Sequence, residues 1–208
     1  MRRSFSLFCI SFISVCFLFS LKLSAQEVTQ SGNGIHEHDG FFLRLLGGPG
    51  YAQMSEKGIS GGDLKLSGVG MPFIVQIGGV VDDNLIVYGI AGGVTVFNPD
   101  LEWGTKTAKT SDTRLMISNF GGGVTYYLMP SNFYFSSSVL ASRVTLQFEN
   151  MKANSKIGFG FNLIIGKEWW VSNDWALGAA IFGHYSQMSD VETINNIAGG
   201  ILFSATLN

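Results

Sequence analysis

The chain has little charge, little proline and almost no cysteine. Only 13% of its residues are charged, about half of the roughly 25% usual in soluble proteins. Cys9 and Cys16 are its two cysteines, and both lie in the first apolar segment. The rest of the chain therefore offers no thiol for a disulfide framework, thiolate catalysis or a zinc site. It has no basic tract either, which argues against nucleic acid as a partner.

The start of the chain has the layout of a secretory signal peptide. Basic residues at Arg2 and Arg3 precede an uncharged apolar run over 5–21, and Ser24-Ala25 offers a small-residue cleavage site. The sequence therefore predicts a signal peptide over 1–25. Cleavage would leave 10 basic and 15 acidic residues, a net charge of −5.

Two other readings of this segment fit less well. A retained membrane helix needs about 17–25 apolar residues, which puts the run at the short limit. A lipoprotein signal at Cys16 is disfavoured because a bulky Val15 precedes the cysteine and the apolar run continues past it. Residues 26–40 are polar without a period, and we expect them to form a flexible periplasmic lead-in.

Beyond residue 40, large apolar residues occupy alternate positions. One run places them at Ile157, Phe159, Phe161, Leu163 and Ile165, while Gly and Asn dominate the other phase. Period-two alternation predicts a β-strand with two unlike faces. Eight such runs are expected, at 41–53, 65–81, 85–97, 113–129, 133–148, 156–170, 175–188 and 193–207.

The face opposite the bulky residues decides the fold. It is rich in Gly, Ala and Ser rather than in the Lys, Glu and Gln of a water-facing strand. Small residues inside and apolar residues outside are typical of a narrow barrel in lipid. The sequence therefore predicts an all-β, eight-stranded antiparallel up-and-down transmembrane β-barrel domain over 41–208.

The connections between the runs support the same fold. Asp82-Asp83-Asn84, Pro130-Ser131-Asn132 and Ser172-Asn173-Asp174 are tight turns. The other connections, at 54–64, 98–112, 149–155 and 189–192, are longer, although the last of them is short. Tight turns at one rim and longer loops at the other are the outer-membrane pattern, with the loops facing outside.

Turning the bulky phase outward assigns a face to each side chain. On the fifth strand it places Leu140, Val144, Leu146 and Phe148 against lipid. Aromatic residues gather near strand ends, where their rings suit the membrane–water interfaces. The predicted interface aromatics are Phe41, Tyr51, Tyr127, Phe133, Tyr134, Trp169, Trp170, Trp175 and Tyr185.

The opposite phase holds a few polar side chains that the barrel would enclose. These predicted lumen residues are Arg44, Gln76, Arg143, Asn162, Glu168 and His184. A lone charge in an apolar lumen is costly, so each needs a partner. Arg44 and Glu168 fall at similar depth near the periplasmic rim, and we predict an ion pair between them. Arg143 falls higher, beside loop acids or water.

On this pattern, the segment 41–208 resembles the small bacterial outer-membrane β-barrels of the OmpA/OmpX-like superfamily. The resemblance implies a location in the bacterial outer membrane, a monomer, and insertion by the outer-membrane assembly machinery. It also implies outer-membrane lipid and lipopolysaccharide as partners, and a structural, adhesive or envelope-protective role. The chain departs from the family by ending at Asn208 rather than at an aromatic residue.

One constellation suggests chemistry. His184-Tyr185-Ser186 is similar to the His-x-Ser segment of the lipid A 3-O-deacylases, in which His activates a Ser nucleophile and a Glu orients the His. The predicted last strand has no acidic residue, and alternation places His184 and Ser186 inside. A structural role is therefore favoured, and catalysis is the alternative.

The remaining candidates are weaker. The segment His36-Glu37-His38-Asp39 could bind a metal ion through its two imidazoles. Two ligands on a flexible leader seldom form a complete metal site. No cofactor motif is present. The sequence thus predicts a non-enzymatic outer-membrane barrel, with Trp103 on the loop 98–112 as the candidate for an extracellular contact. A soluble lipocalin-like carrier, with the apolar phase turned inward, is the second alternative.

Overall fold

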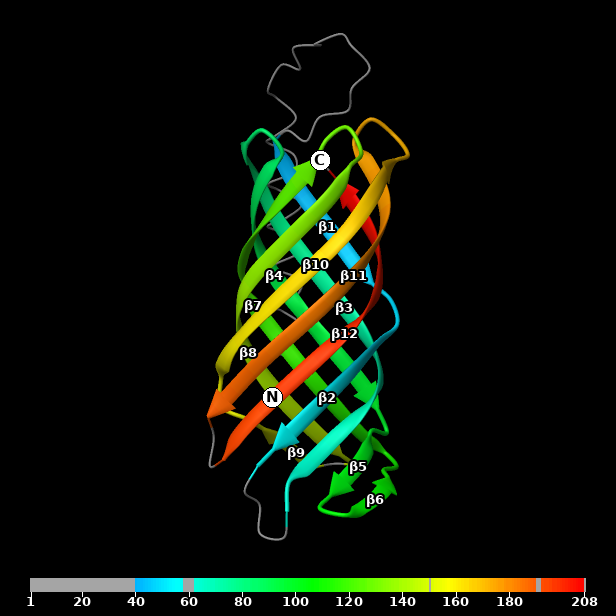
Figure 1. The fold of residues 1–208 in the computed structure, drawn as a ribbon, viewed down its shortest axis with the longest axis vertical. Coiled ribbons are helices and arrows are strands. Elements are labelled where there is room, and N and C mark those ends of the chain that lie inside the picture. The colour runs from blue at the N-terminus through cyan, green and yellow to red at the C-terminus, as the bar shows by residue number, and fades with distance from the viewer. Residues whose placement is uncertain (1–39, 58–61, 150, 190–191, 208) are drawn as a thin grey trace, which may run out of the picture. The chain divides into compact units, whose positions relative to one another are not determined.

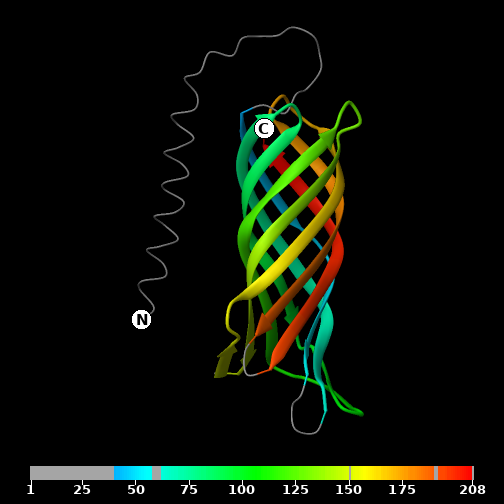
Figure 2. The same cartoon turned by 60° about the vertical axis from the view of Figure 1, so that its left-hand side comes forward.

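In a computed structural model, the described residues are 40–57, 62–149, 151–189 and 192–207. The predicted signal peptide and most of the lead-in lie outside them. The described part is a sheet of antiparallel neighbours that closes on itself (Figures 1 and 2). No helix in these ranges is long and apolar enough to cross a membrane.

The wall follows the predicted runs closely. Its strands are β1 (Phe41–Gly47), β2 (Gly50–Glu56), β3 (Leu64–Asp82), β4 (Leu85–Phe97), β7 (Thr113–Leu128), β8 (Phe133–Phe148), β10 (Gly158–Trp170), β11 (Trp175–Ser189) and β12 (Thr193–Leu207). Three short strands stand in the long connections: β5 (Asp100–Trp103), β6 (Lys106–Lys109) and β9 (Met151–Asn154). β1 and β2 are two parts of one wall strand, so the described wall has the predicted eight strands.

The ring closes where the first strand meets the last. β1 pairs with both β12 and β3, and β2 pairs with the same two strands further along. The two halves keep one register, and only Gly48 and Pro49 fall outside the ladder between them. A Cβ on Gly48 would lie 2.2 Å from the Ile201 carbonyl oxygen, so the close approach at this point requires glycine.

Tight turns gather at one end of the barrel and long connections at the other, as the sequence predicts. The β3–β4 turn has Asn84 at φ 62°, and the β7–β8 turn has Asn132 at φ 55°, a conformation that Asn tolerates better than most residues. β5 and β6 form a hairpin at the long-loop end, in which β5 pairs with the first residues of β3 (Figure 1). β9 pairs with the end of β8. We call the two ends the short-turn end and the long-loop end.

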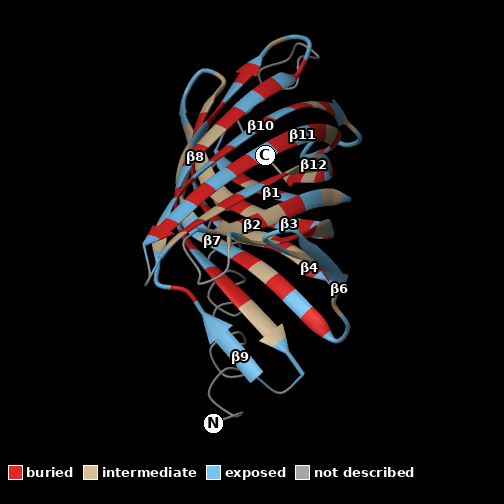
Figure 3. Cartoon of the chain, turned by 60° about the horizontal axis from the view of Figure 1, so that its bottom comes forward, coloured by how far each residue is buried: buried red, intermediate tan, exposed pale blue. Residues whose placement is uncertain are grey.

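Burial alternates along the wall strands (Figure 3). The bulky phase is exposed on the outer face at Val69, Met71, Phe73, Phe159 and Ile181. The inward phase of the same strands is buried. The outer face is therefore the apolar one, which fits a wall that faces lipid. A lipocalin-like carrier would instead turn the apolar phase inward, so the structure does not support that alternative.

The face assignment is wrong for β8. Leu140 and Val144 are buried inside, and Leu146 is half-buried; Phe148 shares their inward phase and is exposed where β8 ends at the long connection. The outward phase of this strand is instead set by Phe133, Phe135 and Val139, which occupy the lower part of the wall. Ser136, Ser138 and Ser142 are buried in the inward phase, which Leu140 and Val144 share.

Candidate functional site

A buried ion pair anchors a polar cluster inside the short-turn end. Arg44 on β1 and Glu168 on β10 are both fully buried, and Arg44 Nε lies 2.9 Å from Glu168 Oε1. This is the predicted pair, and the structure confirms it. Strands β1 and β10 are not neighbours in the wall, so the pair spans the bore rather than joining adjacent strands.

Neighbouring side chains saturate this pair. Tyr127 on β7 donates its hydroxyl to Glu168 Oε2 at 2.7 Å and contacts Arg44 Nη2. Thr206 on β12 donates to Glu168 Oε1 at 2.6 Å. Arg44 Nη1 donates to Gln76 Oε1 on β3 at 3.3 Å. We call these five residues, together with Tyr134, the plug cluster.

Tyr134 on β8 completes the plug cluster from one side. Its ring centre lies 3.9 Å from the guanidinium carbon of Arg44, a cation–π contact. Gly166 leaves room for that ring, because a Cβ there would come within 2.6 Å of it. A buried charge is tolerated only when it is paired and hydrogen-bonded, and here both conditions are met.

Tyr127 and Tyr134 were expected at the membrane interface, and that expectation is wrong. Both are fully buried inside the barrel, where their hydroxyl groups and rings surround Arg44 and Glu168. In each case a neighbour of the opposite phase, Tyr126 or Phe133, takes the outward position. Of the other predicted interface aromatics, Trp170 is half-buried, and six are exposed: Phe41, Tyr51, Phe133, Trp169, Trp175 and Tyr185.

The predicted lumen residues divide into two groups. Arg44, Gln76, Asn162, Glu168 and His184 are buried inside the wall. Arg143 is exposed and on the outer face, so its assignment is wrong. It follows the phase of Val139, and it lies high enough on β8 for an outward charge to reach headgroups and water.

His184 and Ser186 come together halfway along the bore. His184 Nε2 lies 3.2 Å from Ser186 Oγ, and Asn196 Nδ2 donates to the same oxygen at 3.3 Å. Asn196 completes this group, and sequence reasoning missed it although it has the inward phase of the last strand. The hydrogen bond between His and Ser is the geometry that nucleophilic catalysis needs.

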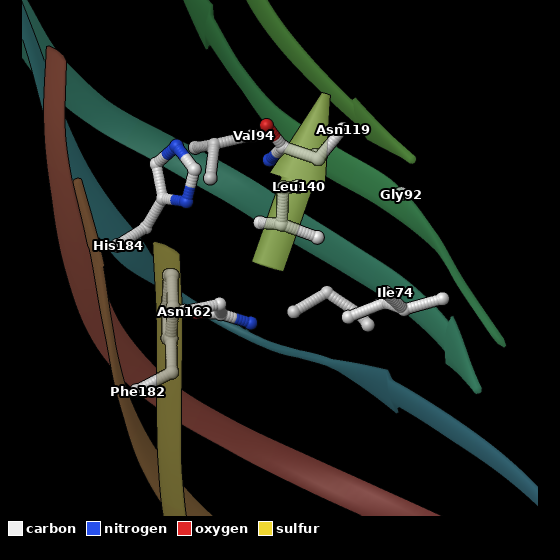
Figure 4. A pocket seen from close by; sticks show the side chains of 10 residues that line it. Ile74, Gly92, Val94, Asn119, Leu140, Asn162, Phe182 and His184 are labelled. Atoms are coloured by element: carbon white, nitrogen blue, oxygen red, sulfur yellow. The ribbon is translucent and has the colours of Figure 1, made fainter. Parts of the chain in front are cut away.

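Two features of this group oppose catalysis. His184 Nδ1 is buried without a hydrogen-bond partner among the described residues, so no carboxylate orients the ring. Ser186 is fully buried, with 0% of its surface exposed. A cavity of about 10 Å³ lies beside His184 and Asn162 (Figure 4). That volume accommodates a single water molecule rather than a lipid acyl chain.

Metal binding and surface contact were the other candidates. Within the described ranges no group of three or more His, Cys, Asp and Glu is placed to hold a metal ion. The segment His36-Glu37-His38-Asp39 lies outside those ranges. Trp103 ends β5 at the tip of the β5–β6 hairpin and is 46% exposed.

Solved structures with the same fold are found, whereas comparisons by sequence find no match. No family model and no curated protein matches the chain. The chain is similar to Neisserial surface protein A, with 15% identity, a TM-score of 0.58, and coverage of 80% of this chain and 96% of that one. OprG from Pseudomonas aeruginosa has 13% identity and a TM-score of 0.49, covering 84% and 99%. Ail of Yersinia pestis has 11% identity and a TM-score of 0.43, with coverage of 80% of this chain and 99% of that one.

The match to Neisserial surface protein A establishes the fold, which is that of the small bacterial outer-membrane β-barrels. The predicted resemblance is thereby confirmed at the level of fold. Together with the apolar outer face of the wall, this fold confirms the predicted location in the bacterial outer membrane.

Proposed function

We propose that this chain, an eight-stranded bacterial outer-membrane β-barrel, is a non-enzymatic envelope protein with a closed bore and an interactive outer end. The observation that carries the proposal is the plug cluster. Its ion pair spans the bore near the short-turn end and is tied to β1, β3, β7, β10 and β12. A solute crossing the membrane would have to break it.

Apart from the group of His184, Ser186 and Asn196, most of the remaining bore is filled by apolar side chains. Ile164 and Phe182 pack at mid-height, and Leu115, Met188 and Leu66 pack toward the long-loop end, all of them buried. An eight-stranded barrel has an interior just wide enough for side chains to fill. This packing supports a structural wall rather than a conduit.

The long-loop end supplies the surface on which partners would act. The β5–β6 hairpin pairs with the start of β3 and exposes Trp103, Lys106 and Lys109. Loops held on a rigid scaffold are where binding residues concentrate. An extracellular partner at this hairpin, and lipopolysaccharide around the wall, therefore belong to the proposal.

Planar-bilayer recording tests the closed bore. The unmodified protein should give no conductance steps after insertion, with heat-modifiable migration in gel electrophoresis serving as proof of folding. The substitution Glu168→Ala should allow transient conductance, because Arg44 then lacks its anchor. Steady conductance through the unmodified protein would contradict a closed bore, and Lys106→Gln on the hairpin is the matched control.

A lipid A-modifying hydrolase is the second candidate, favoured by the contact between His184 and Ser186. It is tested by expressing the protein and its Ser186→Ala variant in a host and comparing lipid A by mass spectrometry. The proposal of a non-enzymatic barrel expects the same acylation pattern in both. Loss of an acyl chain only with the unmodified protein would establish the hydrolase.

A further inference from the structure

A row of polar and basic side chains crosses the outer face at the long-loop end. Strand pairing places Arg114 on β7 beside Phe97 on β4 and beside Gln147 on β8. Gln147 is in turn paired with Lys152 on β9. Paired residues of neighbouring strands share a face, so the four side chains form one row on the outer face.

A second basic level lies four residues below this row. Arg143 is exposed on the outer face of β8. β9 pairs with β8 up to Thr145–Asn154, and β10 resumes the pairing at Ser142–Gly158. The intervening residues 155–157 outnumber their two partners on β8, so a β-bulge places Lys156 next to Arg143. We call Arg114, Arg143, Lys152 and Lys156 the β7–β9 basic patch.

The patch lies at the outer edge of the lipid-facing belt. At the other edge, Lys167 is paired with Phe133 and lies over its ring at 4.9 Å. On β8, Phe133 and Arg143 are separated by about ten residues, or about 23 Å along the barrel axis at ~3.3 Å per residue and ~45° tilt. This matches an apolar band about 25 Å tall. Arg143 therefore lies at the level of the outer-leaflet headgroups.

The two arginines have no acidic partner in the described part of the chain. The two salt bridges found there are Arg44–Glu168 and Lys65–Glu102. Arg114 instead stacks over the Phe97 ring, 4.9 Å from its centre. Exposed planar guanidinium groups suit bidentate binding of phosphate, and the Phe97 ring holds that of Arg114 in place.

A groove beside Arg114 adds hydrogen-bonding groups. It has a volume of about 480 Å³ and is lined by Phe97, Asn98, Asp112, Thr113, Arg114, Gln147 and Glu149. The two carboxylates can accept hydrogen bonds from hydroxyl groups, and the two amides can both accept from them and donate to them. The mixture of an aromatic ring, amides, carboxylates and an arginine suits a polyhydroxylated ring that also carries an anionic group.

We propose that the β7–β9 basic patch and its groove bind the phosphorylated saccharide headgroup of a lipopolysaccharide in the outer leaflet. Arg143 and Lys156 take the phosphate nearest the hydrocarbon, while Arg114 and the groove hold the sugars above it. The proposal rests on the membrane orientation given under the proposed function and deepens it by naming a site. Simple anionic phospholipids lack the sugar hydroxyl groups that the groove would bind.

The test uses the full-length folded protein in detergent micelles. The probes are lipid A with both phosphates, enzymatically dephosphorylated lipid A, and phosphatidylglycerol, each titrated and followed by tryptophan fluorescence. Bisphosphorylated lipid A should bind the unmodified protein at least about tenfold more tightly than either other probe, because charge-assisted bidentate contacts are the strong ones. The variant Arg114→Gln/Arg143→Gln should lose that preference. The matched variant Lys106→Gln/Lys109→Gln, which removes the same charge from the hairpin, should keep it.

Equal affinity of the unmodified protein for lipid A with and without phosphates would overturn the proposal, and this arm needs no variant to fold. Equal affinity for phosphatidylglycerol would overturn the saccharide assignment. An unchanged preference in the arginine variant would overturn the assigned residues. Loss of heat-modifiable migration from the outer-membrane fraction would instead contradict the barrel itself, so the two failures are distinguishable.

Discussion

The two halves of the bore are filled by different means. At the short-turn end, Arg44 and Glu168 form a fully buried ion pair within a network of tyrosine, threonine and glutamine. Toward the long-loop end the bore holds apolar side chains such as Leu66, Leu115 and Met188. A polar network depends on every member, because a charge left without its partner is costly. Apolar packing loses stability in proportion to the atoms removed.

The largest loss of stability is expected when the ion pair of the polar half is broken. Glu168→Ala leaves Arg44 buried without its counter-charge and should lower the free energy of unfolding by about 3–5 kcal/mol. Urea unfolding of the barrel in lipid vesicles, followed by tryptophan fluorescence, measures this change. The paired replacement Arg44→Met with Glu168→Leu should recover most of the loss, because it removes both charges. A single variant as stable as the parent would show that the ion pair does not hold the bore.

Truncating a side chain in the apolar half should lower the free energy of unfolding by less than breaking the ion pair does. The loss should also not depend on any single partner residue. Leu115→Ala removes a fully buried side chain and should cost about 3 kcal/mol of unfolding free energy, by transfer and cavity formation. The control is Met116→Ala, the half-exposed neighbour that faces lipid. Lipid can fill the space that Met116 leaves, so the same unfolding assay should give a clearly smaller change. Equal losses at the two positions would contradict the assignment of faces on β7.

Removing one hydroxyl from the plug cluster sharpens the comparison. Tyr127→Phe keeps the ring and deletes a donor to Glu168, which should cost about 1–3 kcal/mol because a buried carboxylate oxygen loses its bond. The adjacent Tyr126 faces outward, and Tyr126→Phe should change stability by less than about 0.5 kcal/mol. A cost that is the same for both tyrosines would argue against the network.

The smallest loss of stability is expected in the group of His184, Ser186 and Asn196, halfway along the bore. Ser186→Ala leaves His184 Nε2 and Asn196 Nδ2 without their shared partner, at about 1 kcal/mol. Ser137→Ala, on the outer face of β8, should be neutral within about 0.5 kcal/mol. Urea midpoints for the two variants measure the difference. A loss at Ser186 as large as that at Glu168 would erase the contrast between the halves.

Much of the fold could be read from the sequence because strand period and turn chemistry are local. The tight turn at Asp83-Asn84 and the alternation over 157–165 each predict their own structure without reference to distant residues. The Arg44–Glu168 pair was also predictable, since two lone charges of opposite sign and similar depth must find each other.

The errors arose where both phases of a strand carry large side chains. In β8, Phe133, Tyr134 and Phe135 follow one another, so size cannot decide which face points outward. Partners on other strands decide it, since Tyr134 packs against Arg44, which lies ninety residues earlier in the chain. Arg143 was misplaced for a related reason: its depth relative to the lipid determines whether an outward charge is tolerated, and alternation carries no information on depth.

The β5–β6 hairpin lies outside the closed ring. It is joined to the barrel through four paired residues at the start of β3 and a hydrogen bond from Gly104 N to the Asp63 carbonyl oxygen, and its turn at Gly104 has a positive φ of 59°. Additions to this turn should leave the closure of the ring intact, because loop tips tolerate inserted sequence. With the long-loop end facing outward, as proposed, the turn between Gly104 and Thr105 is a natural point at which to display a foreign peptide on the cell surface.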